Sequence, residues 1–100
     1  MILLAEALGN PLGYVAFEKK GYVGTIISIG VAKKFRRRGV GTYLLTQALR
    51  MLREAGVRRV FLQVSVKNLA ARRLYEKLGF KAEGLLKGYY RGRRTLYFIA

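Results

Sequence analysis

The sequence contains no cysteine, no histidine and no aspartate. Without cysteine, the chain can form no disulfide bond or thiolate metal site, and it has no cysteine nucleophile. The absence of histidine and aspartate removes the usual zinc ligands, the Ser-His-Asp triad and the commonest general base. We therefore expect no metal cofactor. Carboxylate chemistry is left with five candidate side chains, Glu6, Glu18, Glu54, Glu76 and Glu83.

Acidic residues are also heavily outnumbered. Five glutamates stand against 20 lysines and arginines, which leaves a formal net charge of +15. Such an excess on a small chain implies an anionic partner, such as a nucleotide cofactor, a nucleic acid or an acidic surface. A generally basic background explains the charge equally well, so charge alone does not choose between these partners.

Long hydrophobic runs are absent as well. No apolar stretch approaches the roughly 20 residues that span a bilayer, so we expect no membrane partner. The first residues lack a basic segment and reach Glu6 early, which is unlike a signal peptide. The sequence therefore favours the cytoplasm.

The chain is strongly patterned instead. Its 100 residues are 52% hydrophobic, which predicts a single folded domain over residues 1–100. Alternating apolar residues predict strands, and turn residues at 9–11 and 19–21 join the first three strands into an antiparallel meander. The expected strands cover residues 2–7, 12–18, 22–31, 58–66, 80–86 and 95–99.

Two segments have helical rather than alternating spacing. The first helix is expected to begin at Val40, with Gly56 just past its end. The second is expected over Leu69–Leu78, with Asn68 as its N-cap and Gly79 at its end. A strand, helix and strand of this length require a parallel crossover. We therefore predict an α/β domain with a mixed, largely antiparallel sheet and two crossover helices.

The stretch from Ile26 to Leu45 combines an apolar strand, a basic turn and the start of the first helix. The turn contains three arginines and a Gly-x-Gly sequence, made of Arg36, Arg37, Arg38, Gly39, Val40 and Gly41. Free N–H groups, a positive helix dipole and glycine together form a site suited to a pyrophosphate. A purely structural turn remains the alternative, and the pattern is neither a Walker loop nor a dinucleotide fingerprint.

A second motif carries a family resemblance. The sequence Asn68…Ala71…Leu74-Tyr75…Leu78-Gly79-Phe80 would by itself fit an ordinary capped helix. Following Arg36-x-x-Gly39-x-Gly41, it resembles the GNAT superfamily of N-acetyltransferases over residues 26–80. Tyr89-Tyr90 is similar to the protein N-terminal and ribosomal-protein alanine acetyltransferase branch, although residues 91–94 are basic where that branch has an acidic stretch.

The resemblance implies an acyl-CoA N-acyltransferase-like domain that binds acetyl-CoA and acetylates an amine, with a protein N-terminus as one candidate acceptor. It implies that the pyrophosphate binds the amides from Arg37 to Thr42 and that Asn68 contacts the cofactor. The pantetheine arm would pair with the backbone of β-strand residues Ile29, Gly30 and Val31. Tyr75 would lie near the sulfur and protonate it, and a backbone N–H near Val31 would polarise the carbonyl.

The proton acceptor is where the sequence departs from this branch. A glutamate of the branch corresponds to Gln63, and a neutral amide cannot take up a proton. Two alternatives stay open. A water chain could carry the proton to Glu18 or to solvent, with Gln63 ordering one water. Alternatively, the positive surroundings could lower the pKa of the acceptor amine.

The start of the chain is a second departure, because it resembles the family's second strand and so implies an N-terminally shortened domain. A truncated start, a natural minimal form and a dimer that supplies the missing wall would each explain this. Ile2–Ala7 would then be an exposed apolar edge, which favours a homodimer or higher oligomer. Two other functions stay open. One is a catalytically weak CoA-binding or interaction module. The other is a nucleic-acid-binding protein that uses the aromatic and basic residues 88–94.

Overall fold

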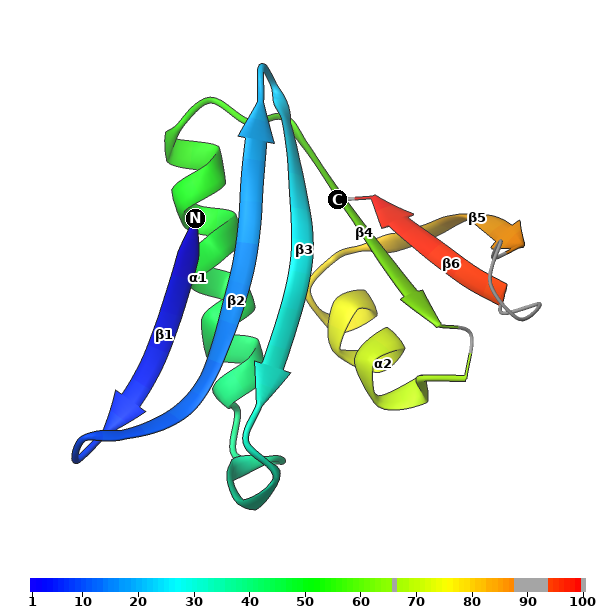
Figure 1. The fold of residues 1–100 in the computed structure, drawn as a ribbon. Coiled ribbons are helices and arrows are strands. Elements are labelled where there is room, and N and C mark those ends of the chain that lie inside the picture. The colour runs from blue at the N-terminus through cyan, green and yellow to red at the C-terminus, as the bar shows by residue number, and fades with distance from the viewer. Residues whose placement is uncertain (66, 88–93, 100) are drawn as a thin grey trace.

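The computed structural model describes residues 1–65, 67–87 and 94–99, and this part of the chain forms one six-stranded sheet with two α-helices (Figure 1). The α/β prediction is confirmed. A short 3-10 turn, Lys33–Phe35, precedes the first helix. The elements in chain order are β1 (Ile2–Ala7), β2 (Asn10–Lys20), β3 (Val23–Val31), α1 (Val40–Glu54), β4 (Arg59–Ser65), α2 (Leu69–Lys77), β5 (Lys81–Lys87) and β6 (Arg94–Ile99).

The strand order is β1-β2-β3-β4-β6-β5. β3 and β4 pair in parallel, and every other neighbouring pair is antiparallel, so the mixed, largely antiparallel sheet is confirmed. β6 lies between β4 and β5 and runs antiparallel to both. β4 and β5 are therefore parallel to each other, and α2, like α1, is a crossover helix.

The first hairpin turn lies earlier than predicted. Leu8 and Gly9 form it with φ angles of 51° and 78°, and two left-handed residues match the twist of the flanking strands. Asn10 and Pro11, predicted as turn residues, begin β2 instead. Pro11 is tolerated there because it lies at a strand end, next to Leu12, which is an extra residue of β2 relative to β1.

The glycines predicted to follow a strand or a helix lie closer to their predicted places. Gly21 has a φ of 59° and turns the chain into β3, although β2 runs on through Lys20 and so takes up residues predicted for the turn. Gly56 and Gly79 follow α1 and α2 with φ angles of 93° and 94°. Both helix ends are thus confirmed to within a residue.

Both helices pack on one face of the sheet, but they contribute unequally to the core. α1 buries Leu44, Leu45, Ala48, Leu49 and Leu52, the helical spacing that the sequence predicts. α2 buries Tyr75, whose ring meets Phe80 edge-on at a centroid distance of 5.9 Å. Val66, predicted for the core face of β4, lies outside the described residues. The sheet contributes Val15, Phe17, Ile26, Val60, Leu62 and Val64.

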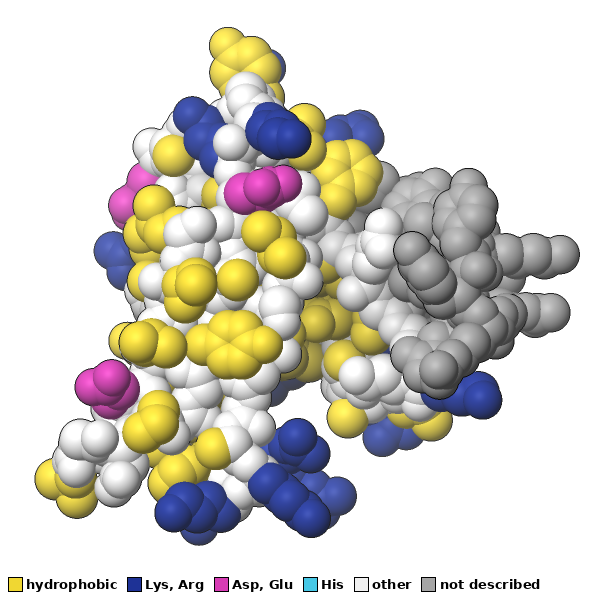
Figure 2. Space-filling view, in the orientation of Figure 1, with side chains coloured by type: hydrophobic (Ala, Val, Ile, Leu, Met, Phe, Trp, Pro, Cys, Tyr) yellow, Lys and Arg dark blue, Asp and Glu magenta, His cyan; other side chains and the backbone are white. Residues whose placement is uncertain are grey.

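The opposite face of β1, β2 and β3 carries no helix in the part of the chain that the structure describes. We call it the bare face. Ile2 and Leu4 are each 64% exposed there, and Figure 2 shows hydrophobic side chains gathered over these strands. Among the described residues, no helix has the length and apolar character needed to cross a membrane.

Candidate functional site

The sheet is interrupted between β3 and β4. The two strands pair only over Val23–Ile26 and Arg59–Leu62. Beyond that point β3 stays paired with β2 while β4 pairs with β6, so the strands separate toward the end where α2 lies (Figure 1). This separation leaves a space that we call the opening.

A bulge in β3 lies where the separation starts. Residues 16 and 17 of β2 lie opposite residues 28 and 26 of β3, so Ile27 is an extra residue in its strand. A bulge of this kind bends the strand and increases its twist. It also leaves Ile27 58% exposed beside the opening.

The opening has a volume of about 240 Å³ and is lined from both faces of the sheet. On the helix side, α2 contributes Tyr75, and Asn68 lies at its N-terminus. Ser28 lies on the bare side, because it pairs with Ala16, which alternates with buried residues of β2. Gln63 lies on the same side, because it alternates with buried residues of β4. A ligand held on the helix side can therefore meet a second molecule that enters from the bare side.

The edge of β3 that faces the opening is available to a ligand. Ile29, Gly30 and Val31 pair with β2 on one side, and no described strand pairs with them on the other. Such an edge can accept an extended molecule as an added strand. These are the residues for which the family resemblance implies pantetheine pairing.

Tyr14 fixes the other side of this segment. A Cβ atom added at Gly30 would lie 2.5 Å from Cε1 of Tyr14, so the ring packs directly over the glycine. The Tyr14 hydroxyl forms a 2.7 Å hydrogen bond with the Ser28 hydroxyl, which places Ser28 firmly at the opening. The sequence does not predict this pair, because no local pattern links residues 14 and 28.

The N-terminus of α1 is open in the way an anion site requires. Gly39 is its N-cap residue, with a φ of 79°, no capping side chain and no acidic residue in the first turn. The first-turn N–H groups of Val40, Gly41 and Thr42 therefore donate no hydrogen bond to a capping side chain. Figure 2 shows Lys and Arg side chains gathered beyond the end of β3, where this loop lies.

The preceding arginines differ in their local structure. Arg36 Nε donates a 3.3 Å hydrogen bond to the Val31 carbonyl, which ties the loop to the end of β3. Arg37 has a φ of 65°, which is unfavourable for a residue other than glycine. Arg38 is exposed. Unfavourable backbone angles of this kind are typical of ligand-binding loops.

Gly41 brings these parts together. A Cβ atom there would lie 3.4 Å from Leu74 Cδ2 on α2 and 3.7 Å from Val31 Cγ2 on β3. The start of α1, the end of β3 and the middle of α2 are therefore neighbours. The structure thus gathers the predicted site residues around one end of β3, although they come from three separate stretches of the sequence.

Asn68 and Tyr75 have distinct roles within α2. Asn68 Oδ1 accepts a 3.1 Å hydrogen bond from the Ala71 amide, so its side chain caps the helix as predicted. Its amide nitrogen makes no hydrogen bond among the described residues. Tyr75 is 5% exposed, and burial raises the pKa of its hydroxyl above the ordinary value. It therefore remains protonated at neutral pH and can donate a proton.

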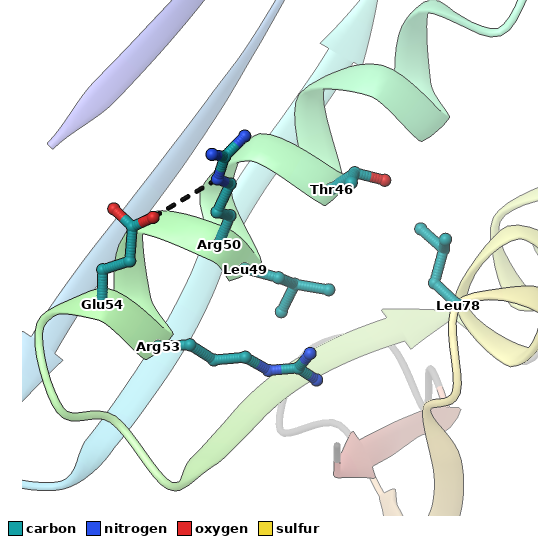
Figure 3. A pocket seen from close by; sticks show the side chains of 6 residues that line it. All are labelled: Thr46, Leu49, Arg50, Arg53, Glu54 and Leu78. Carbon is teal, nitrogen blue, oxygen red and sulfur yellow. Dashed lines mark hydrogen bonds and ion pairs between the residues drawn. The ribbon is translucent and has the colours of Figure 1, made fainter.

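A second groove lies between the two helices, away from the opening (Figure 3). It has a volume of about 320 Å³. Arg50 and Glu54 form a 3.3 Å ion pair at its edge, while Arg53 extends beside it. The groove offers neither a free strand edge nor an open helix N-terminus, so the opening is the better candidate. Its lining residues are Thr46, Leu49, Arg50, Arg53, Glu54 and Leu78.

Two other predictions concern metal binding and the basic aromatic loop. Within the described ranges, no group of three or more carboxylate, imidazole or thiol side chains is placed to bind a metal. Tyr89, Tyr90 and the rest of segment 88–93 lie outside the described residues.

A family model described as "Acetyltransferase (GNAT) family" matches residues 1–80. The chain belongs to the GNAT acetyltransferase family. The resemblance drawn from the two sequence motifs is thereby confirmed. The family assignment covers β1 through α2, including the opening and both helix N-termini.

Two curated relatives show which GNAT proteins the chain is similar to. It is 40% identical over 113 aligned positions to an N-alpha-acetyltransferase of Sulfurisphaera tokodaii, covering 97% of this chain and 66% of that protein. It is 39% identical over 66 residues to a [ribosomal protein bS18]-alanine N-acetyltransferase of Salmonella typhimurium, covering 66% and 45%.

A solved GNAT structure matches nearly the whole chain. It is a Bacillus anthracis acetyltransferase in complex with acetyl coenzyme A, with a TM-score of 0.88 and 28% identity, covering 98% of this chain and 60% of that one. The chain spans less than two thirds of the length of each of these three proteins.

Proposed function

We propose that this GNAT chain binds acetyl-CoA and transfers its acetyl group to an amine, with a protein N-terminal α-amine as the acceptor. The observation that carries the proposal is the meeting of an uncapped basic helix N-terminus with the free edge of β3, beside an opening lined by Tyr75. The names of the two relatives support an α-amine.

The cofactor-binding residues follow from the open hydrogen-bonding groups. The amides from Arg37 to Thr42 suit the pyrophosphate, because they meet its charge with both N–H groups and the helix dipole. The edge of Ile29, Gly30 and Val31 suits the pantetheine arm, and the free amide nitrogen of Asn68 suits a carbonyl of that arm. Arg36 contributes by fixing the loop on Val31.

Acetyl-CoA supplies an activated acyl group as a thioester. The acceptor amine enters from the bare face, and its nitrogen attacks the carbonyl carbon. We assign to a backbone N–H near Val31 the stabilisation of negative charge on the carbonyl oxygen. We assign to Tyr75 the donation of a proton to the leaving sulfur, which its buried and protonated hydroxyl can perform.

Calorimetric titration with CoA tests the binding step. Replacing both Arg37 and Arg38 by Ala keeps the loop amides but removes two positively charged side chains beside the proposed pyrophosphate site. It should weaken CoA binding by roughly tenfold or more, because a hydrogen bond to a charged group contributes about 1.5–3 kcal/mol. The matched control is Arg53→Ala, which removes a charge from the groove of Figure 3 and should leave CoA affinity unchanged. Failure to bind CoA at millimolar concentration would refute the proposal.

A CoA-binding or interaction module with weak catalysis is the second candidate, and Gln63 favours it because an amide cannot act as a base. Thioester loss with a panel of amines separates the two. The proposed enzyme consumes acetyl-CoA steadily, and Tyr75→Phe slows it while CoA affinity is kept. A nucleic-acid-binding protein would instead bind random RNA with a steep salt dependence that CoA does not alter.

We also propose a homodimer formed through β1 and a cytoplasmic location. β1 is the edge strand of the sheet, and exposed Ile2 and Leu4 make it a suitable surface for pairing with a second copy. Sedimentation at micromolar concentration should show a dimer, and a monomer there would refute this part. The cytoplasm is supported by the proposed substrates, since acetyl-CoA and new protein N-termini occur together there.

A further inference from the structure

Few of the described side chains that line the opening are ionisable. Among the described residues around it, Tyr75 is the one with an ionisable side chain. Burial raises the pKa of the Tyr75 hydroxyl, so the group stays protonated at neutral pH and cannot accept a proton there. The remaining lining side chains are aliphatic, hydroxyl or amide groups.

Gln63 occupies the position where a base would be most useful. It lies on β4 between buried Leu62 and Val64, so its exposed side chain is on the bare face from which an acceptor would enter. An amide oxygen can accept a hydrogen bond, but it can neither take up a proton nor neutralise an ammonium group.

Among the side chains that the structure describes, no carboxylate on a surrounding element lines the opening. Glu18 lies on β2, with β3 between it and the opening, and Glu76 lies on α2 next to Tyr75 but is not one of the lining residues. Two cationic residues lie on the same elements, Lys67 just before α2 and Arg59 on β4. In a chain of net charge +15, an ammonium group in the opening therefore meets repulsion, and no carboxylate among the described lining residues compensates it.

From this geometry we infer that the acceptor amine enters the opening already uncharged, and that Gln63 makes the site selective for amines that lose their proton near neutral pH. The inference rests on the proposed acetyltransferase function and goes further, because it predicts which amines react. α-Amines are favoured over lysine side chains, and the selection requires no contact with the rest of the acceptor.

The proton balance is consistent with an opening whose described side chains include no base. The nitrogen lone pair forms the C–N bond, the C–S bond breaks, and a proton from the nitrogen ends on the sulfur. A neutral amine and a thioester therefore give an amide and a thiol with no net release of protons. A base is needed only to deprotonate an ammonium group, and water does this before the acceptor enters.

The expected selectivity follows from the ordinary pKa values of amines. An α-amine has a pKa of about 7.8, so roughly a quarter of it is neutral at pH 7.4. A lysine side chain has a pKa of about 10.4, so roughly a thousandth of it is neutral at the same pH. Two peptides of one sequence, one with a free α-amine and one with a capped N-terminus and a single lysine, should therefore differ about 300-fold in kcat/KM. The rate should rise with pH until the acceptor's own pKa.

Gln63→Glu is the decisive variant, because a carboxylate there could hold and deprotonate an ammonium group. It should reduce the selectivity between the two peptides at least tenfold and move the rise in rate to lower pH. The matched control is Gln47→Glu on α1, which makes the same chemical change away from the opening and should leave the selectivity unchanged.

A binding measurement provides a readout independent of turnover. Calorimetric titration of the CoA-bound protein with the α-amine peptide should show affinity rising from pH 6 to pH 9, as the neutral form becomes populated. A peptide with a hydroxyl in place of the amine should show no such rise. Gln63→Glu should bind the ammonium form, so its affinity should be highest at the lower pH.

Two results would overturn the inference while leaving the proposed function intact. One is acetylation of the lysine peptide within tenfold of the α-amine peptide. The other is a pH–rate profile in which a group of the protein titrates at a pH below the acceptor's pKa, when Glu18→Gln removes that titration. If CoA binds but no amine is acetylated, the calorimetric measurement decides the inference by itself. If CoA does not bind at all, both the proposed function and the inference fail.

Discussion

The two helices begin at the same end of β3, but their N-termini are built differently. α1 starts at Gly39 behind three arginines, without a capping side chain, whereas α2 starts at Asn68, whose side chain caps it at 3.1 Å. α1 has 15 residues and buries five of them, while α2 has 9 residues and buries Tyr75. α1 leaves its first-turn amides available to a ligand, whereas α2 binds one of its first-turn amides with its own Asn68 side chain.

The difference in burial explains why α1 is stable without a capping side chain at its N-terminus. A fully buried leucine side chain contributes about 1.5–3 kcal/mol, whereas a good N-cap contributes about 1 kcal/mol. A helix held by several buried leucines does not depend on its cap. A short helix with a single buried aromatic residue depends more on its cap. Mutations in the two helices can therefore test the comparison.

The largest effect is expected from shortening a core leucine of α1. Leu45 is 0% exposed, so Leu45→Ala should lower the free energy of unfolding by about 2–5 kcal/mol through lost burial and the cavity left behind. The matched control on α2 is Leu69→Ala. Leu69 is 56% exposed, and its loss should cost below about 1 kcal/mol. Denaturant unfolding measures both, and equal losses would show that the two helices are anchored alike.

A smaller loss is expected at the start of α1. Gly39→Ala forces an alanine to a φ of 79° and should cost about 1–2 kcal/mol. Gly41→Ala is the control, because Gly41 has no positive φ and its added Cβ meets Leu74 at an ordinary 3.4 Å. That variant should be as stable as the parent or more so, since alanine favours a helix. A loss at Gly41 matching that at Gly39 would contradict the backbone explanation.

The sequence predicted most of the elements because their signals are local. Helical spacing after Val40 and the N-cap at Asn68 located both helices, and glycines placed their ends. The loop arginines and both helix N-termini were grouped as one candidate site, and the family resemblance was needed to connect α2 with the loop. These features depend on residues within a few positions of one another.

The opening itself could not be predicted, because it depends on pairing between distant strands. β4 leaves β3 in order to pair with β6, which is more than 25 positions later in the chain. Tyr14 and Ser28 likewise meet only through the register of β2 and β3. The left-handed Arg37 had no signal either, since glycine is the residue expected at such an angle. The Ile26-Ile27 pair, which breaks the alternation of β3, was the one local sign of a bulge.

A still smaller effect is expected from removing the cap of α2. Asn68→Ala should lower the free energy of unfolding by about 1 kcal/mol, because the Ala71 amide loses its side-chain acceptor. Asn68→Ser is the control, since a serine can cap the same amide and should keep most of the stability. If both variants were equally destabilised, the asparagine would contribute through something other than the cap.

The smallest effect concerns the ion pair near the end of α1. Arg50 and Glu54 lie 3.3 Å apart with side chains 70% and 68% exposed, so solvent screens their attraction. A double-mutant cycle with Arg50→Ala and Glu54→Ala should give a coupling of about 0.3–0.5 kcal/mol, and 1 M salt should abolish most of it. A coupling well above about 1 kcal/mol would mean that α1 is held partly by surface charge. Its tolerance of an uncapped N-terminus could then no longer be attributed to the buried leucines alone.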